Sequence, residues 1–347
     1  MSVRRKMTAV VPAVLAMLAV TTACTGSGGD DRILVYSGEH ETLAQAWASA
    51  FTAATGIAVT LRSGDDNDLG NQIVSEGPDS PADVFLAAAA PAVARVDRAG
   101  RFAGLDRDTL AQVPERYRAA DGDWIGIAAR TAAFVYDPAK LPADRLPASL
   151  LELAQPQWRG RWAADTAGAD FRAMVAAVLA QQGEDVTREW LRGVRADVVA
   201  AQSPGAAMAG VDTGRYDGAL VFADHWFRDR AGTDAVGTDR SAAAEHSGRT
   251  ALYRFVSPDP GAFVSVSGAG VLRSSRNRSA AQRFVRFVTG QAGQQLSRDA
   301  AGLEYPVAED IPPDPALPPL DPGAPLLDPG NVDDARVDRL VTEAGLA

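Results

Sequence analysis

The stretch Ile33–Ala54 constrains the fold of this chain more than any other. It begins with the apolar, strand-forming run Ile33–Tyr36 and continues through the polar turn Ser37–Glu41, which carries His40 between two glutamates. Apolar residues then recur at positions 43, 46, 47, 50, 51 and 54, the spacing of one helix face, and Thr42 is predicted to cap that helix. The order strand, turn, helix puts the turn at the carboxyl end of a parallel strand, where open α/β sheets present ligand sites.

Short apolar runs and amphipathic segments keep alternating along the chain, so we expect an α/β protein with largely parallel sheets. Two strands, Trp124–Arg130 and Ala133–Tyr136, are predicted on either side of a short polar step. The proline-rich segment Pro312–Pro329 should be extended and, because it carries several leucines, should pack along the protein body. A short amphipathic helix is predicted over Asp333–Ala344. With 347 residues, the chain is long enough for two domains.

The N-terminus has the pattern of a targeting signal. Basic residues at positions 4–6 precede the apolar stretch Ala9–Val20, which is too short to span a bilayer. Cys24, the only cysteine, follows a small residue just after this stretch, as in a bacterial lipoprotein signal. We therefore expect a signal peptide over 1–23, lipidation of Cys24, a linker over 24–31, and an extracytoplasmic protein anchored to the cell membrane by its lipid. A plain secretory signal cleaved nearby is the alternative.

Composition and motifs exclude several function classes. The formal net charge is −10, which argues against a nucleic-acid partner. The sequence has no G-x-S-x-G elbow and no phosphate-binding loop, and His40-Glu41 begins like a zinc-protease motif whose second ligand position is Ala44. We therefore do not expect an enzyme. An extracytoplasmic hydrolase that uses His225 and Asp224 stays an alternative class, although no nucleophile accompanies them.

Two of the three histidines stand at comparable positions. His40 lies in the first strand–helix turn, and His225 follows the apolar strand Gly218–Phe222 just before another predicted helix. Turns of this kind can face each other across a cleft, and imidazole with a carboxylate such as Asp224 suits first-row metal ions. The alternative is that both are solvent-facing residues at helix starts. His246 is predicted to lie in a surface loop without a functional role.

Several short segments, none specific alone, keep one order through the chain: Val35–His40, Phe51–Ser63, Pro81–Phe85, Val135–Asp137, Trp158–Gly160, Asp259–Ala262, Val266–Leu272 and Glu304–Pro306. Together they resemble the periplasmic ferric-ion-binding proteins of bacterial iron ABC importers, the bacterial transferrins. The resemblance implies the two-lobed, type II (Venus-flytrap) periplasmic-binding-protein fold with two hinge crossovers, near Arg130–Thr131 and Arg254–Phe255. Lobe 1 would comprise 32–130 and 255–305, and lobe 2 would comprise 131–254 and 306–347.

The resemblance also implies a metal site, with departures. The family histidine corresponds to His40, the family glutamate to Ala88, and the two adjacent family tyrosines to Asp224 and His225. The implied metal ligands are therefore His40, Asp224 and His225, with Glu39 as a candidate additional ligand. Because phenolates suit ferric iron better than Asp and His do, a divalent ion stays open.

A companion anion, phosphate or carbonate, completes the metal shell in such relatives. Here its predicted contacts are Arg130, whose planar fork suits an oxyanion, with Thr166 and Gly168 at a helix N-terminus. Asp170 would repel an anion if it pointed inward. For Arg130 the alternative role is a salt bridge between the lobes.

The implied function is that of a substrate-binding lipoprotein that captures iron, Fe(III) with its companion anion, between two lobes. It would deliver the ion to an ABC permease and its ATPase, and we expect a monomer. The alternative keeps the fold but binds a small organic anion or a phosphorus oxyanion.

Overall fold

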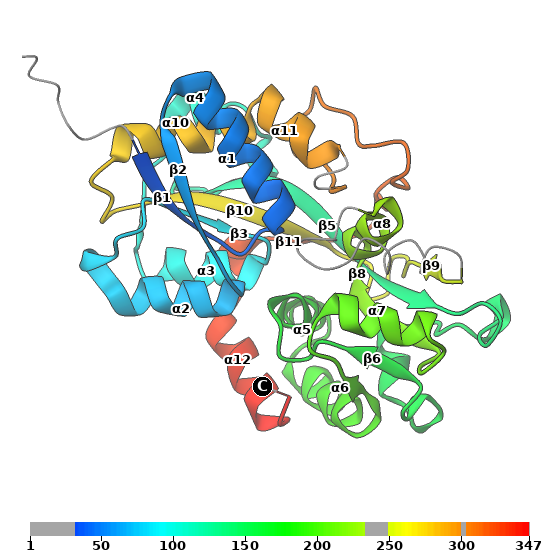
Figure 1. Ribbon diagram of the computed structural model, residues 1–347. Helices are drawn as coiled ribbons and strands as arrows, with labels where there is room; N and C mark the ends of the chain where they lie inside the picture. The colour runs from blue at the N-terminus through cyan, green and yellow to red at the C-terminus, as the bar shows by residue number, and fades with distance from the viewer. Residues whose placement is uncertain (1–31, 233–248, 300–302, 347) are drawn as a thin grey trace, which may run out of the picture.

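The structure is a computed structural model that describes residues 32–232, 249–299 and 303–346. The predicted signal, the linker, Cys24 and His246 lie outside these residues. Two lobes, each built on a sheet with helices packed against it, share one long strand, β5 (Ile125–Tyr136) (Figure 1).

The sheet of the first lobe has the order β2-β1-β3-β10-β5. Helices α1, α10 and α11 cover one face, and α2 and α3 cover the other (Figure 1). The strands are β1 (Arg32–Ser37), β2 (Ala58–Ser63), β3 (Val84–Ala87) and β10 (Val264–Leu272), with the short β4 (Phe102–Ala103) and β11 (Leu326–Leu327) at β10. The helices are α1 (Glu41–Thr55), α2 (Asp66–Glu76), α3 (Ala90–Arg98), α4 (Arg107–Leu110), α10 (Arg278–Thr289) and α11 (Gln291–Arg298).

The sheet of the second lobe has the order β5-β8-β6-β7, and β9 also pairs with β5. Neighbouring residues of its strands enter different cores: Phe134 and Leu220 pack with α5, whereas Val135 and Val221 pack with α7. This alternation is that of a strand covered on both faces. The strands are β6 (Trp162–Ala164), β7 (Val199–Ala200), β8 (Gly218–Phe222) and β9 (Ala251–Tyr253), and the helices are α5 (Ala169–Gln182), α6 (Glu184–Asp197), α7 (Pro204–Asp212) and α8 (Ala223–Ala231).

Strand β5 corrects one prediction. The two strands expected on either side of a polar step are one continuous strand, and the step falls where the strand changes neighbours: Thr131 pairs with Val264 and Ala132 pairs with Phe222. The polar residues therefore mark the passage between lobes. β10 pairs antiparallel with β3 and β5, and β5 pairs antiparallel with β8, whereas the β1–β2, β1–β3, β6–β8 and β10–β11 pairs are parallel.

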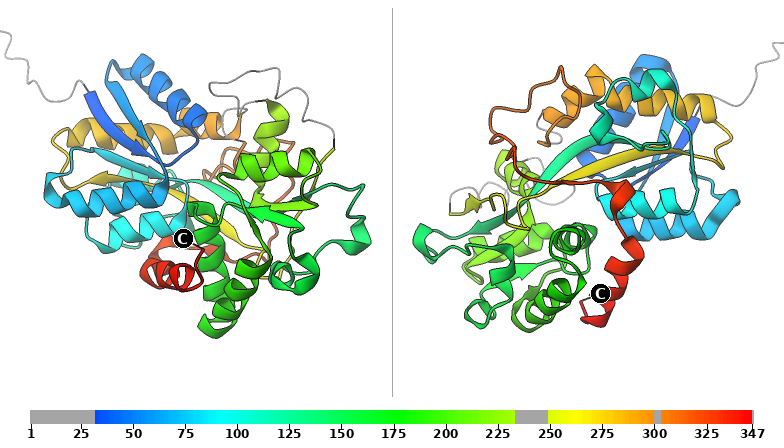
Figure 2. Two further views of the ribbon diagram at one scale, coloured as in Figure 1. Left: turned by 60° about the horizontal axis from the view of Figure 1, so that its bottom comes forward. Right: turned by 180° about the vertical axis from the view of Figure 1, so that it is seen from behind.

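The C-terminal segment runs along both lobes. Val307 and Leu317 belong to the first core, although the sequence-based division placed 306–347 in the second lobe, and Leu327 joins the second core. The predicted packing of the proline-rich stretch is thus confirmed. Helix α12 (Asp334–Glu343) follows and packs against α3 of one lobe and α5 and α6 of the other (Figures 1 and 2).

In the part of the chain that the structure describes, no helix has the length and apolar character needed to cross a membrane.

Candidate metal centre

His40 is positioned by the junction between β1 and α1. Helix α1 begins at Glu41, so His40, rather than Thr42, is the N-cap residue, and its side chain makes no capping bond. The turn before it is packed tightly: a Cβ on Gly38 would lie 1.5 Å from Oδ1 of Asp66. A larger residue at position 38 would therefore displace Asp66 or the turn that precedes His40.

Asp224 and His225 are positioned by the equivalent junction in the second lobe. Strand β8 ends at Phe222, and Asp224 and His225 lie in the first turn of α8. The side chain of Asp224 is buried, and that of His225 is 12% exposed. The two strand–helix junctions therefore present imidazoles and a carboxylate from opposite lobes.

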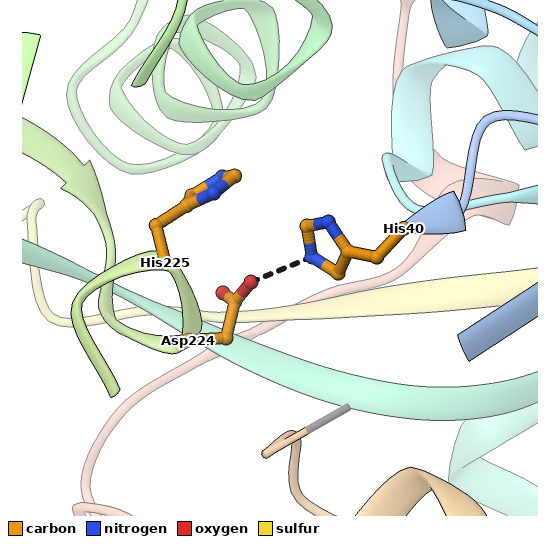
Figure 3. Close-up of side chains that lie close together, drawn as sticks. All are labelled: His40, Asp224 and His225. Atoms are coloured by element: carbon orange, nitrogen blue, oxygen red, sulfur yellow. Dashed lines mark hydrogen bonds and ion pairs between the residues drawn. The ribbon is translucent and has the colours of Figure 1, made fainter. Parts of the chain in front are cut away.

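These three side chains converge, as predicted. Nε2 of His40 lies 2.8 Å from Oδ2 of Asp224, and the rings of His40 and His225 are 5.1 Å apart at their centroids, edge to face (Figure 3). One ligand atom of each residue lies within 4.8 Å of the others, which is the compactness a single metal ion requires. Their role as ligands remains a prediction.

His225 is engaged at both ring nitrogens. Nη2 of Arg228 donates to Nδ1 at 3.1 Å, so the ring proton belongs on Nε2, which donates to Oδ2 of Asp170 at 2.7 Å. A metal ion that binds Nε2 must displace that proton. For the ring to stay neutral the proton would have to move to Nδ1, and the hydrogen bond from Arg228 would be lost. Arg228 and Asp170 therefore orient the ring in the metal-free arrangement.

Arg130 is buried on β5 and pairs across the lobes. Its Nη2 donates to Oδ1 of Asp170 at 3.0 Å and to the carbonyl of Ala88, and its guanidinium lies 4.5 Å from the ring centroid of Phe222. The alternative role for Arg130, an interlobe salt bridge, is therefore what the structure has. Asp170 points inward, which is the orientation in which it was expected to repel an anion.

A cavity of about 190 Å³ lies between these groups. His40, His225, Arg130 and Gly168 line it, whereas Thr166 is buried and does not. The remaining lining residues include four aspartates, at positions 65, 66, 165 and 170. The cavity therefore faces many more carboxyl groups than cations, which favours a cation as its ligand.

Two glutamates are buried beside His40, Asp224 and His225. Glu39 is 4% exposed and Glu304 1%, and no carboxyl oxygen of either has a hydrogen-bond partner among the described residues. Oε1 of Glu304 lies 3.5 Å from Nε2 of His40. Buried carboxyl groups without donors are costly, so a cation that reaches them would be bound strongly.

The titration of the site follows from burial. Burial and the nearby Arg228 lower the pKa of His40 to about 3, so its ring is neutral at pH 7. Burial raises the pKa of Glu39 to about 7 and that of Glu304 well above its usual range. Burial would also raise the pKa of Asp224, but His225, His40 and Arg130 together hold it well below its usual range. Asp224 is thus a carboxylate beside the neutral imidazole of His40, and both are ligand types that a metal ion binds.

Sequence reasoning missed three residues of the site: Asp66, Arg228 and Glu304. Asp66 accepts hydrogen bonds from the N–H groups of Ala88 and Ala89 at 3.2 and 2.8 Å, so a carboxyl group from α2 lies beside Ala88, the position that the resemblance assigns to the family glutamate. The polar turn after β2 was a usable signal for Asp66. For Glu304 the only sequence signal was its place in Glu304–Pro306, one of the segments that resemble the family.

Comparison with known proteins identifies the family. Residues 79–333 match the bacterial extracellular solute-binding proteins. The chain belongs to this family. A Fe(3+)-binding periplasmic protein of Serratia marcescens is 44% identical to this solute-binding protein and is matched over 92% of each chain. The major ferric iron-binding protein of Neisseria meningitidis serogroup B is 36% identical, over 84% of this chain and 85% of that one.

The structural comparison agrees. Iron-bound HitA from Pseudomonas aeruginosa superposes with a TM-score of 0.81 at 34% identity, covering 90% of this solute-binding protein and 99% of HitA. The predicted two-lobed, type II fold and the resemblance to ferric-ion-binding proteins are confirmed. Because members of the family are solute-binding proteins, the prediction that the chain is not an enzyme is confirmed as well.

Proposed function

We propose that this solute-binding protein captures iron, as Fe(III), between its two lobes. The observation that carries the proposal is the convergence of His40 with Asp224 and His225 from opposite lobes, beside the buried carboxyl groups of Glu39 and Glu304. The names of the relatives in Serratia and Neisseria support iron as the ligand. Closure would be favoured by the ion because ligand groups from both lobes meet it only in the closed arrangement.

The carboxyl groups of Asp224, Glu304 and Glu39 would compensate for the absence of the family's tyrosines and glutamate. Ferric iron prefers hard, anionic oxygen ligands. Asp224 supplies one, and Glu304, whose Oε1 lies 3.5 Å from Nε2 of His40, and Glu39 are further buried sources, with a pKa that an adjacent cation would lower. We therefore assign the oxygen ligands to carboxylates rather than phenolates.

The alternative ligand, a small organic anion or a phosphorus oxyanion, has less support. Arg130 is a cation on the cavity wall, but it already pairs with Asp170, and three further aspartates line the same cavity. The companion anion predicted for iron, phosphate or carbonate, would meet the same carboxyl groups.

We further propose that the protein is the lipid-anchored component of an ABC importer and delivers its ion to a permease and its ATPase. The family is an extracellular one, and the sequence pattern around Cys24 supports the anchor. Mass spectrometry of the protein from membranes of its host, with a Cys24→Ala control, would test lipidation at that residue.

Equilibrium dialysis against a ligand panel tests the proposed ligand. The panel contains ferric iron presented by a weak chelator, divalent manganese and zinc, phosphate, and small carboxylic acids. We expect one iron per chain, with weaker binding of the divalent ions. Retention of an organic acid or phosphate by the iron-free protein, with no uptake of iron, would replace this function with the alternative.

A further inference from the structure

Helix α12 contacts the two lobes through two different kinds of side chain. Its apolar residues Val337, Leu340 and Val341 belong to the second core, together with residues of α5 and α6. Asp334 and Asp338 lie four residues apart, on one face of the helix, and both pair with arginines of α3 in the first lobe. The helix is therefore packed into one lobe through apolar side chains and paired with the other through charged ones (Figures 1 and 2).

The carboxylate of Asp338 joins arginines from opposite lobes. It pairs with Nη2 of Arg95 on α3 and, at 3.0 Å, with Nε of Arg172 on α5. Nη1 of Arg95 also donates to Oδ1 of Asn71 on α2 at 3.0 Å, so this guanidinium is held within the first lobe. One carboxylate on α12 thus spans the boundary between the lobes.

The two helices that Asp338 joins both begin at the candidate metal centre. Ala88, two residues before α3, and Gly168 and Asp170, at the start of α5, line the cavity. A rotation of the lobes that widens the cavity moves α3 away from α5. Because α12 is packed with α5, the same rotation separates Arg95 from the carboxylates of α12.

We infer that the carboxylates of Asp334 and Asp338 form a clasp, which holds the lobes in the arrangement that brings the candidate metal ligands together. Its effect on iron affinity rests on the proposed function: an ion that binds only the closed arrangement is bound more weakly by the factor by which the closed fraction falls. The side chain of Arg95 is 10% exposed and that of Asp338 is 38% exposed, so salt can reach and screen their pair.

The test compares Asp338→Asn with a matched variant on the same helix. Glu343→Gln also removes a partly exposed carboxylate of α12, but its partner Arg188, at 3.4 Å, lies on α6 of the same lobe. Competition against a chromogenic chelator reports iron affinity in about 0.01 M and about 1 M sodium chloride, between which the screening length falls from about 30 Å to about 3 Å. Small-angle X-ray scattering of the iron-free proteins reports how far the lobes are open.

Asp338→Asn should open the lobes and weaken iron binding. At low salt we expect about 3- to 5-fold weaker binding than in the wild type, the upper part of the range for partly exposed ion pairs, and a larger radius of gyration without iron. Both differences should shrink at high salt, where the wild-type pair is itself screened. Glu343→Gln should match the wild type in affinity and radius. A role of Asp338 in folding alone would change neither the radius nor the salt dependence.

The outcomes separate the clasp from the function it supports. Equal affinity and equal radius of Asp338→Asn and wild type at low salt would overturn the clasp and leave iron capture standing. Glu343→Gln that opens and loses affinity as much as Asp338→Asn would also overturn it, because the effect would then come from the stability of α12.

Two further outcomes are decided by scattering. If Asp338→Asn does not fold, the wild type alone tests the clasp: its iron-free radius should grow from low to high salt, and an unchanged radius would overturn the inference. Wild-type protein that takes up no iron in any buffer would overturn the proposed function, whereas the radii of the iron-free proteins would still decide whether the clasp holds the lobes.

Discussion

His40 and Asp224 are 184 residues apart in the chain, yet Nε2 of one lies 2.8 Å from Oδ2 of the other. Each residue stands where a strand gives way to a helix, in opposite lobes that meet at this contact. A hydrogen bond therefore joins the two lobes directly at the proposed metal site. Single substitutions near this contact can therefore test the proposed site.

The iron-loaded protein should lack the visible colour of tyrosinate-bound iron. All six tyrosines lie in the described part of the chain, and none lines the cavity. The nearest in sequence to a site residue, Tyr305, donates its hydroxyl to the carbonyl of Pro318 at 2.6 Å. An absorption spectrum of the loaded protein should therefore show no phenolate-to-iron charge-transfer band. A strong band that disappears in Tyr305→Phe would assign iron to a phenolate instead of the carboxylates.

Glu39 should make the iron-free protein less stable as the pH rises. Burial raises the pKa of Glu39 from 4.5 to about 7, so the folded state holds a proton that the unfolded state releases above pH 4.5. Stability linked to this group is therefore fully present below pH 4.5 and is lost as the pH rises through 7. At about 1.4 kcal/mol per pKa unit, the loss is about 3 kcal/mol.

Urea denaturation of wild type and Glu39→Gln at pH 5 and pH 8 measures this effect. The variant should be more stable than the wild type at pH 8 and nearly equal to it at pH 5. Glu41→Gln is the matched control, because Glu41 is an exposed neighbour on α1 and should show no such difference between the two pH values. Equal stabilities of Glu39→Gln and wild type at pH 8 would show that Glu39 carries no such penalty.

Gly38→Ala should damage both folding and iron binding. Its Cβ would lie 1.5 Å from Oδ1 of Asp66, the carboxyl group that accepts from Ala88 and Ala89, so the turn or Asp66 must move. Overpacking of this kind costs about 1–3 kcal/mol of unfolding free energy. Gly205→Ala is the control, since its nearest neighbour is Oγ of Ser203 at 3.9 Å. Wild-type stability and iron affinity in Gly38→Ala would show that Asp66 is not fixed as described.

Asp334→Ala should destabilise the protein more than Asp338→Ala. Asp334 on α12 is 8% exposed at its side chain and pairs with Arg95 at 3.0 Å and with Arg98, both on α3. Its removal leaves the nearly buried Arg95 with Asn71 and the more exposed Asp338 as its remaining partners, so the expected cost is about 1–3 kcal/mol. Asp338 is 38% exposed and should contribute about 1 kcal/mol or less, although it pairs with Arg172 at 3.0 Å and also with Arg95. Chemical denaturation measures the unfolding free energy of both variants. A larger loss in Asp338→Ala than in Asp334→Ala would contradict the prediction.

The sequence predicted the two strand–helix junctions because their signal is local. The apolar runs before His40 and Asp224 and the helical spacing after them need no knowledge of the rest of the chain. The continuity of β5 could not be predicted in this way, because it depends on Val264 and Phe222 serving as successive neighbours of Thr131 and Ala132. In the sequence alone, a polar step within one continuous strand has the same pattern as a break between two strands.

The candidate site was predictable only at positions that correspond to the family's ligand positions. His40, Asp224 and His225 were found from their positions, but the buried carboxyl groups of Asp66 and Glu304 arrive from elements that no spacing connects to them. The inward orientation of Asp170 depends on its contacts with Arg130 and His225. Packing between the lobes determines an orientation of this kind.

Iron affinity in a double-mutant cycle of His40→Ala and His225→Ala tests the central claim, that one ion is held by both lobes. Each single variant should bind iron about 100-fold more weakly or worse, at or beyond the effect usual for an outer-shell residue. The double variant should lose less than the product of the two losses, because both residues act on the same ion. His246→Ala should bind like the wild type. Wild-type affinity in either single variant would contradict the account.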